Sequence, residues 1–181
     1  MLFRSGISAM SDIWLVSDTH WGHENVLKFT DRDGKLIRGS KFASVEEMDE
    51  HMVERWNSVV KDGDKVYHLG DVYFAQGHRI LTRLKGQKRL ILGNHDNGKD
   101  QNLVRHFGKV VVWRMFTEFD MLLTHVPVHP QSLQYGVKYN IHGHLHQNSV
   151  NDDRYYNVSV EQIDYTPVHI EDVQKIMRSR F

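Results

Sequence analysis

Five short apolar runs along this chain each end in an aspartate, an asparagine or a histidine. The runs are IWLVSD (13–18), VYHLGD (66–71), LILGN (90–94), MLLTH (121–125) and YNIHGH (139–144). Near-continuous apolar runs of this length are typical of strands that are buried on both faces, as in α/β proteins. We therefore predict five strands that belong to an α/β fold.

Three further segments have the spacing of amphipathic helices. The first begins at Ser44, which has the pattern of a capping box with Glu47. Its apolar positions are Val45, Met48, Met52, Trp56, Val59 and Val60. The helix should end before KDGDK (61–65), because glycine and aspartate in that segment favour a turn.

The other two predicted helices lie later in the chain. One should end at Gly86, and its apolar positions are Ile80, Leu81 and Leu84. The last begins near Glu171 and ends in basic residues, which suit the negative end of the helix dipole. Its expected buried positions are Ile170, Val173, Ile176 and Met177.

Length and composition favour a single domain. The chain has 181 residues, of which 40% are hydrophobic, and this is enough for one sizeable core but not for two. We expect residues 10–181 to form that domain and residues 1–9 to be a disordered extension or a tag remnant. No apolar run approaches the roughly 18 residues that a membrane helix needs, so no membrane contact is expected.

The charge balance and the cysteine content narrow the chemistry further. Lysine plus arginine and aspartate plus glutamate both total 23, so a strongly basic surface for nucleic acid is not indicated. A small substrate suits this balance better than long DNA. The absence of cysteine is typical of a cytoplasmic protein, and any metal ion must be held by histidine, aspartate, glutamate or asparagine.

Histidine is the unusual residue, with 13 in the chain. In open α/β sheets the ligand crevice lies beyond the carboxyl ends of the strands, so the polar strand ends can converge on one face. His20 lies two residues after Asp18, and His146 lies two residues after His144. In an extended segment such pairs point the same way, so each pair can hold one ion or two adjacent ions.

Seven oxygen or imidazole donors follow from this pattern. They are Asp18, His20, Asp71, Asn94, His125, His144 and His146. One six-coordinate ion cannot use seven donors and keep an open position, whereas two ions that share a bridging carboxylate can. The number of donors therefore favours a dinuclear site.

The same residues lie in five ordered motifs: DTH (18–20), GD (70–71), GNHD (93–96), TH (124–125) and GHLH (143–146). These motifs resemble the five blocks of the calcineurin-like metallophosphoesterases, in that family's order. The segments HWGHENVL (20–27) and YNVSVEQIDYTPV (156–168) resemble a small bacterial and phage branch of the superfamily. The resemblance implies a single-domain, four-layer α/β/β/α sandwich.

The resemblance also implies roles for individual residues. It assigns Asp18, His20 and His146 to one metal ion, Asn94, His125 and His144 to the other, and Asp71 to a bridging position. His95 is expected to be a proton donor that faces the substrate phosphate, with Asn94 beside it. His23 either reaches the substrate or caps the helix after it. Hard donors without a thiolate suit Mn²⁺, Fe or Zn²⁺, of which Mn²⁺ is favoured.

The activity that the resemblance implies is hydrolysis of small phosphodiesters or phosphomonoesters, by in-line attack of a hydroxide that bridges two metal ions. Two alternatives stay open: a nuclease for short or single-stranded nucleic acid, and a non-catalytic scaffold of the same fold. The segment GDVYFA (70–75) departs from the GDxVDRG pattern of protein phosphatases, so phosphoproteins are not expected substrates.

Two groups of residues complete the expectations. Residues 31–43, with an Asp33-Gly34 turn, should form a hairpin or loop that contacts the substrate without affecting the metal ions. The remaining residues of note lie in or beside apolar runs and are expected in the core. They are His68, His142, Trp21, Trp56 and Trp113.

Overall fold

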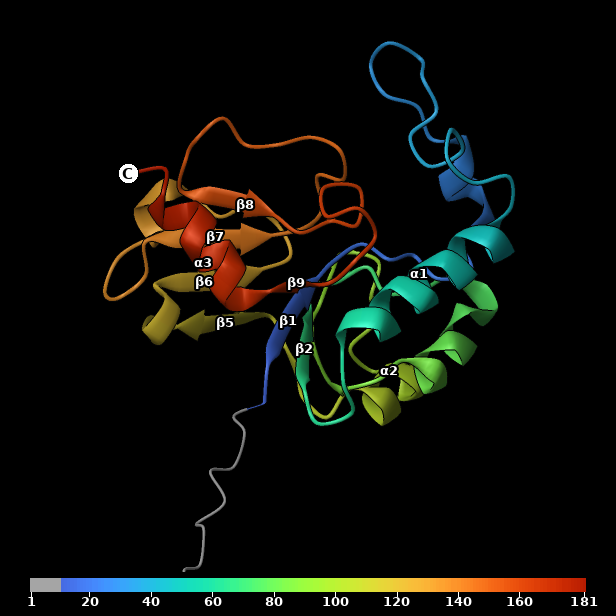
Figure 1. Cartoon of the computed structure of the whole chain (residues 1–181), viewed down its shortest axis with the longest axis horizontal. Helices are drawn as coiled ribbons and strands as arrows, with labels where there is room; N and C mark the ends of the chain where they lie inside the picture. Colours follow the sequence, from blue (N-terminus) through green and yellow to red (C-terminus); the bar gives the residue numbers. More distant parts are fainter. Residues whose placement is uncertain (1–10) are drawn as a thin grey trace, which may run out of the picture.

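Two β-sheets form the centre of the structure, a computed structural model that describes residues 11–181 (Figure 1). One sheet has the strand order β4-β3-β2-β1-β9, and the other has the order β5-β6-β7-β8. A single cluster of buried apolar side chains includes residues from both sheets and from the helices. The chain is therefore a mixed α/β domain with one core. The extension expected at residues 1–9 lies outside the described residues, as does Met10.

The first sheet is parallel except at one edge. Its strands β1 to β4 run parallel to one another, and β9 pairs with β1 in the antiparallel direction. The strands are β1 (Ile13–Val16), β2 (Lys65–His68), β3 (Gln87–Ile91), β4 (Val110–Val111) and β9 (Val168–His169). The carboxyl ends of β1, β2 and β3 consequently lie at the same edge of this sheet.

The second sheet has the same mixed character. Strands β6, β7 and β8 are parallel, and β5 is an antiparallel edge strand. The strands are β5 (Trp113–Phe116), β6 (Met121–Thr124), β7 (Tyr139–His142) and β8 (Tyr155–Asn157). All residues of β6 and β7 are buried, as the continuous apolar runs predict.

The five predicted strands are confirmed as β1, β2, β3, β6 and β7. The pattern did not reveal the other four strands, because β4, β8 and β9 have only two or three residues. Strand β5 carries exposed side chains at Trp113 and Arg114 and therefore lacks an apolar run. The expectation that Trp113 is a core residue is wrong, since it is 56% exposed on this edge strand. Trp21 and Trp56 are buried as expected.

Helix α1 (Val45–Val59) begins as predicted at Ser44, whose hydroxyl accepts a hydrogen bond from the Glu47 backbone N–H at 3.1 Å. The Glu47 carboxylate accepts from the backbone N–H of Ala43, one residue earlier than a capping box requires. The second predicted helix is present as a 3₁₀ segment, η2 (Ala75–Arg83), and Gly86 follows it with φ +89°.

The last predicted helix is α3 (Ile170–Arg178), and it buries three of the four expected side chains. Ile176 is 41% exposed, because Ile170, Val173 and Met177 form the buried stripe and residue 176 falls beside it. Helix α2 and three short 3₁₀ segments complete the helices. They are α2 (Gln101–His106), η1 (Glu24–Lys28), η3 (Thr117–Phe119) and η4 (Pro130–Ser132).

The helices cover different sheets. In Figure 1, α1 and α2 lie on the side of β1 and β2, whereas α3 lies over the strands of the second sheet. Arg178 of α3 pairs with Asp120 beside β6, and Arg180, which follows α3, donates to the Tyr155 carbonyl in β8. Within residues 11–181, every helix is too short or too polar to cross a lipid bilayer.

The two sheets meet where β1 ends. The backbone of Ser17 donates to the Val158 carbonyl at 2.9 Å, and the Ser17 carbonyl accepts from Val160 at 3.1 Å. Ser17 thereby forms a parallel bridge with Ser159, in the segment that follows β8. This bridge brings the carboxyl ends of strands from both sheets to one place.

Burial of His68 at the end of β2 makes stability depend on pH. The ring is buried, and desolvation lowers its pKa from 6.5 to about 3, so the folded protein keeps it neutral. The unfolded chain takes up this proton below pH 6.5, and stability is therefore lost as the pH falls from 6.5 towards 3. We expect His68→Gln to flatten this slope by ~1.4 kcal/mol per pH unit, measured by urea unfolding of the chelator-treated protein. Identical slopes for both proteins would show that His68 does not stay neutral in the fold.

Candidate metal centre

The seven predicted donors lie immediately beyond the carboxyl ends of five strands. Asp18 and His20 follow β1, Asp71 follows β2 and Asn94 follows β3 in the first sheet. His125 follows β6, and the pair His144 and His146 follows β7 in the second sheet. The parallel direction of these strands and the bridge at Ser17 bring all seven to the junction of the sheets.

The carboxylates and imidazoles form two groups that could each hold a metal ion. One group contains Asp18, His20 and His146, and the other contains Asp71, His125 and His144. Within each group the donor atoms lie within 4.8 Å of one another. Asp71 lies between the groups, because its Oδ2 is 3.8 Å from His20 Nε2 and 3.5 Å from His125 Nε2.

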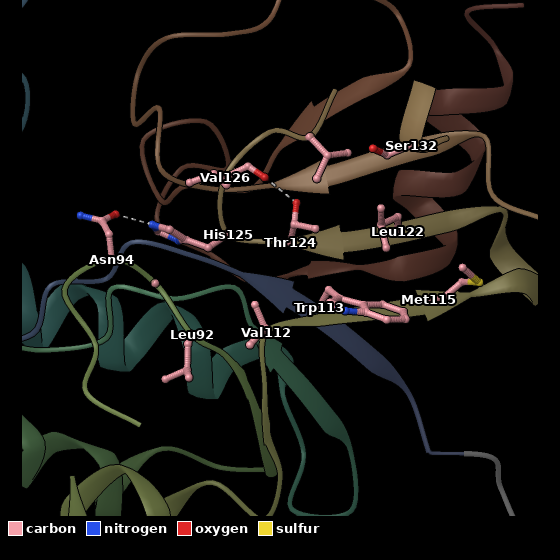
Figure 2. Close-up of a pocket in the computed structure, with 12 residues that line it drawn as sticks. Leu92, Asn94, Val112, Trp113, Met115, Leu122, Thr124, His125, Val126 and Ser132 are labelled. Atoms are coloured by element: carbon pink, nitrogen blue, oxygen red, sulfur yellow. Dashed lines mark hydrogen bonds between the residues drawn. The ribbon is translucent and has the colours of Figure 1, made fainter. Parts of the chain in front are cut away.

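Asn94 adds an oxygen to the second group. Its Oδ1 lies 2.9 Å from His125 Nε2 and 2.9 Å from His144 Nδ1. Figure 2 shows Asn94 and His125 pointing toward each other from the segments that follow β3 and β6. The structure therefore brings together all seven residues named from the sequence, with Asp71 in the same group as His125 and His144.

The chemistry of the donor atoms fits a pair of cations. Asp18 Oδ1 and His20 Nε2 are buried and have no hydrogen-bond partner among the described residues. Buried polar atoms of this kind are costly unless a partner satisfies them. A divalent ion between Asp18, His20 and His146 would satisfy both atoms at once.

Each carboxylate has one oxygen fixed by the protein and one that faces the imidazoles. Asp18 Oδ2 accepts hydrogen bonds from the His144 backbone and from the Ser159 hydroxyl, both at 2.9 Å. Asp71 Oδ1 accepts from the His95 backbone at 2.9 Å. The other oxygens, Asp18 Oδ1 and Asp71 Oδ2, are the ones that approach the histidines.

Two imidazoles are oriented by partners behind them. His125 Nδ1 lies 2.7 Å from the Leu69 carbonyl, which fixes a proton on Nδ1 and leaves Nε2 free as a donor atom. His146 Nδ1 lies 2.9 Å from the Glu161 carboxylate, and its Nε2 points toward Asp18. Such outer partners set the tautomer and the orientation of metal-binding histidines.

The backbone at the donors is unusual. Five of the seven donor residues have a left-handed backbone with φ between +50° and +67°, a region that residues other than glycine rarely adopt. They are Asp18, His20, Asp71, His144 and His146. Strained backbone of this kind persists where the surroundings enforce it and is frequent at functional sites.

This backbone corrects the reason given for the D-x-H and H-x-H pairs. Both segments turn through left-handed positions, so an extended pleat does not explain why their side chains converge. Asp18 and His20 belong to one group, whereas His144 and His146 divide between the two groups. The first pair could therefore hold one ion together, whereas the second pair could contribute to two adjacent ions.

Asp96 and Gly93 explain the rest of the GNHD motif. The Asp96 carboxylate accepts hydrogen bonds from the backbone N–H groups of Asp71, Val72 and Gly93 at 2.8 to 3.0 Å. A Cβ atom at Gly93 would lie 2.2 Å from Asp71 Oδ1, so only glycine allows this approach. Asp96 and Gly93 thus hold the end of β3 against Asp71.

Arg38 connects residues 31–43 with the first group of donors. Its side chain is fully buried and donates to the backbone carbonyls of Asp18 at 2.5 Å and Thr19 at 3.0 Å. Its Nε lies 2.7 Å from Glu161 Oε1, the atom that also contacts His146. The segment is therefore attached to the first group of donors, and these contacts give it a route to influence the ion that the group could hold.

The sequence did not reveal Arg38 and Glu161 as parts of the centre. They are 123 residues apart, and neither lies in a strand-end motif. The sequence offers only a weak signal: an arginine in a polar loop, and a glutamate that directly follows three buried residues, Val158 to Val160. Their contact depends on the tertiary fold.

His95 and His23 lie around the two groups of donors. The exposed His95 ring is 5.9 Å from the His20 ring and 5.3 Å from the Phe74 ring, measured between centroids. It belongs to neither group of donors. His23 stacks on Phe74 with centroids 4.0 Å apart and makes no side-chain hydrogen bond that caps η1, which removes the capping alternative.

Burial and charge shift the protonation of the centre. Burial and the nearby Arg38 lower the pKa of His20, so its ring stays neutral and able to bind a cation. Burial raises the pKa of Asp71, a shift that a bound divalent ion would oppose. Burial would also raise the pKa of Glu161, but Arg38 and His146 outweigh it and lower that pKa to about 2.

Comparison with other proteins identifies relatives and a similar fold. No model of a known protein family matches the chain. The chain is 32% identical to the uncharacterized protein MJ1445 of Methanocaldococcus jannaschii, over 93% of each protein. It is 30% identical to the gene 66 protein of Mycobacterium phage L5, over 76% of this chain and 78% of that protein. The chain belongs to the family of these two proteins.

A solved structure has the same fold. The crystal structure of the protein of unknown function AQ665 from Aquifex aeolicus aligns with a TM-score of 0.72, over 92% of this chain and 99% of that chain. Sequence identity in this alignment is 23%, so the likeness concerns the fold alone.

The contact of Glu161 with His146 leads to a prediction about one ion only. We expect Glu161→Gln to weaken Mn²⁺ binding at the group of Asp18, His20 and His146 by ~10- to 100-fold, because the charge that orients His146 is lost. Isothermal titration calorimetry should resolve one weakened and one unchanged binding event. Exposed Glu118→Gln serves as the control. Two unchanged events would contradict the orienting role of Glu161.

Proposed function

We propose that this chain is a dinuclear-metal-dependent phosphohydrolase of the calcineurin-like metallophosphoesterase type, acting on small phosphodiesters or phosphomonoesters. The observation that carries the proposal is the position of Asp71 between two groups of donors. Paired sites that share a carboxylate are typical of enzymes that act on phosphate esters. The five motifs in their order, with their donors at one junction, support the same assignment.

The arrangement of the sheets supports the finer assignment of the fold. Two mixed sheets meet at the centre, with α1 and α2 beside one sheet and α3 over the other (Figure 1). This is compatible with a four-layer α/β/β/α sandwich of the metallophosphoesterase type. In such a fold the strand ends of both sheets supply the donors, as they do here.

The donor set suits Mn²⁺, Fe or Zn²⁺, because it consists of imidazole, carboxylate and amide groups without a thiolate. Asp18, His20 and His146 would hold one ion, Asn94, His125 and His144 the other, and Asp71 both. Ions held there would supply a more acidic bound water and positive charge opposite the oxygens of a phosphoryl group. Burial lowers the pKa of His20 and of His144, which favours the neutral rings that bind cations.

His95 is the proposed proton donor for the leaving oxygen. Its backbone N–H is tied to Asp71 Oδ1, which sets the position of the residue relative to the centre. Its ring is exposed beside His20 and is therefore accessible to a substrate. His23, stacked on Phe74 within 5.7 Å of the His20 ring, is a proposed substrate contact.

Hydrolysis itself is the direct test. The Mn²⁺-loaded protein should hydrolyse at least one member of a panel of p-nitrophenyl esters, cyclic nucleotides, dinucleotides and phosphomonoesters, and EDTA should abolish the activity. Short single-stranded oligonucleotides belong in the panel, because preferential cleavage of these would favour a nuclease. A fully metal-loaded protein that cleaves none of the panel would overturn the proposal in favour of a scaffold.

Substitution of Asp71 should weaken the binding of two ions, whereas substitution of any other donor should weaken mainly one. We expect Asp71→Asn to weaken both ions, because its Oδ2 approaches a histidine of each group. His125→Asn, which changes a donor of one group, is the matched comparison and should weaken mainly one ion. The measurement is metal content by mass spectrometry after dialysis. Loss of only one ion from Asp71→Asn would show that this carboxylate does not bridge.

Asn94 and His95 are neighbours with different proposed roles. Asn94→Ala should lower the affinity for one ion, so added Mn²⁺ should partly restore its activity. His95→Asn should retain both ions and lose ~10²- to 10⁴-fold in kcat on alkyl or nucleoside esters, whose leaving oxygen needs a proton. Its loss on p-nitrophenyl esters should be small, since p-nitrophenolate leaves without a proton. Equal losses on both classes would rule out proton donation.

A further inference from the structure

A cavity of about 600 Å³ opens directly beside the second group of donors. Asn94 and His125 form part of its wall, and the rest comes from β5, β6, the segments next to them and the residues that follow β3 (Figure 2). The volume lies within the range of small-molecule sites, roughly 300–1,000 Å³. A phosphate held at the centre would therefore have its organic group at the mouth of this cavity.

The wall of the cavity is apolar and uncharged. Its largest side chains are Leu92, Trp113, Met115 and Leu122. Among the described residues that line it, none is aspartate, glutamate, lysine or arginine, and the polar ones are Asn94, Thr124, His125 and Ser132. The Thr124 hydroxyl donates to the Val126 carbonyl at 2.6 Å, so its proton is already used (Figure 2). The polar atoms of Asn94 and His125 approach each other at the metal centre.

The rim exposes apolar side chains. Val112 is 68% exposed, Trp113 56% and Val126 46%. A contiguous exposed apolar surface around a concave site is typical of ligand recognition. Here it adjoins residues that the proposed function assigns to metal binding.

We propose that this cavity binds an uncharged apolar group, aryl or alkyl, of the phosphate ester on which the protein acts. The inference rests on the proposed function and specifies its substrate class. A nucleobase or a sugar would lose hydrogen bonds to water on entering, and the wall offers few groups that replace them. An aryl or alkyl group has no hydrogen bonds to water to lose, and removal of its apolar surface from water favours binding.

Continuity with the centre favours this occupant over a second protein. The same two residues, Asn94 and His125, belong both to the cavity wall and to the second group of donors. In a phosphate ester the organic group is bonded directly to the phosphate. One molecule can therefore place its organic group in the cavity and its phosphate at the adjoining centre. A protein partner could pack against the rim alone, so binding of such a partner would not account for a cavity that leads to the centre.

Binding of phosphonates tests the inference without any catalytic step. Methyl-, butyl- and phenylphosphonate carry the same anionic group, are not hydrolysed as esters and differ only in apolar surface. Isothermal titration calorimetry on the Mn²⁺-loaded protein should give a Kd for the butyl and phenyl compounds at least ~10-fold below that of the methyl compound, as expected for burial of several carbon atoms. Equal Kd values for the three compounds would overturn the inference.

Two variants locate the effect. Trp113→Ser and Val112→Asp change exposed positions, so neither should unfold the chain, and both should raise the Kd of phenylphosphonate by ~10-fold while leaving methylphosphonate unchanged. Tyr135→Ala, at a residue 91% exposed outside the cavity wall, is the matched control and should change neither value. Sedimentation measured on the same proteins detects self-association. Equal phosphonate affinities combined with a dimer that Trp113→Ser dissociates would assign the surface to a second copy and overturn the inference.

The two proposals fail in different ways. Phosphonates that bind with chain-length dependence to a protein that hydrolyses no ester would contradict the proposed function and leave the apolar site standing. Hydrolysis of the ester panel, together with equal phosphonate affinities, would contradict only the apolar site.

Discussion

Burial of two carboxylates at the junction of the sheets is the constraint on which the rest of the centre depends. Asp18 and Asp71 are almost inaccessible, and each has one oxygen that faces imidazoles rather than water. A buried carboxylate is costly unless it is paired. Ser159 and backbone N–H groups offset this cost at Asp18 Oδ2 and Asp71 Oδ1, and the other two oxygens face the histidines, where cations could bind.

Backbone geometry at the strand ends follows from that constraint. Left-handed conformations at five donor residues and the absence of a Cβ at Gly93 let chain segments approach more closely than regular strands allow. Asp96 and Arg38 then stabilise these approaches through hydrogen bonds to backbone groups of Asp71 and Asp18. The sheets thereby hold the donor side chains in a fixed arrangement, which is what metal binding and catalysis require.

Much of this could be read from the sequence, for identifiable reasons. Continuous apolar runs revealed the five buried strands. Polar residues at their ends indicated seven candidate donors that the fold brings together, because parallel strands place their carboxyl ends together. Edge strand β5 was missed since it carries exposed Trp113 and Arg114, and α3 buries one side chain fewer than its pattern predicts.

The residues that orient the donors could not be read in this way. Arg38 and Glu161 meet only in the folded chain, and segment 31–43 has the composition of an ordinary surface loop. The apolar cavity likewise combines residues from β5, β6 and distant loops, so no local pattern indicates it. Local sequence specifies which donor side chains are available. Tertiary contacts decide which residues orient these side chains and which cavity adjoins them.

The central claim is that the junction holds two metal ions bridged by Asp71. Anomalous diffraction from crystals grown with Mn²⁺ tests it most directly. The account predicts two peaks about 3.5 to 4 Å apart, one among Asp18, His20 and His146 and one among Asn94, His125 and His144, with Asp71 in contact with both. A single peak, or two peaks that do not share Asp71, would contradict it.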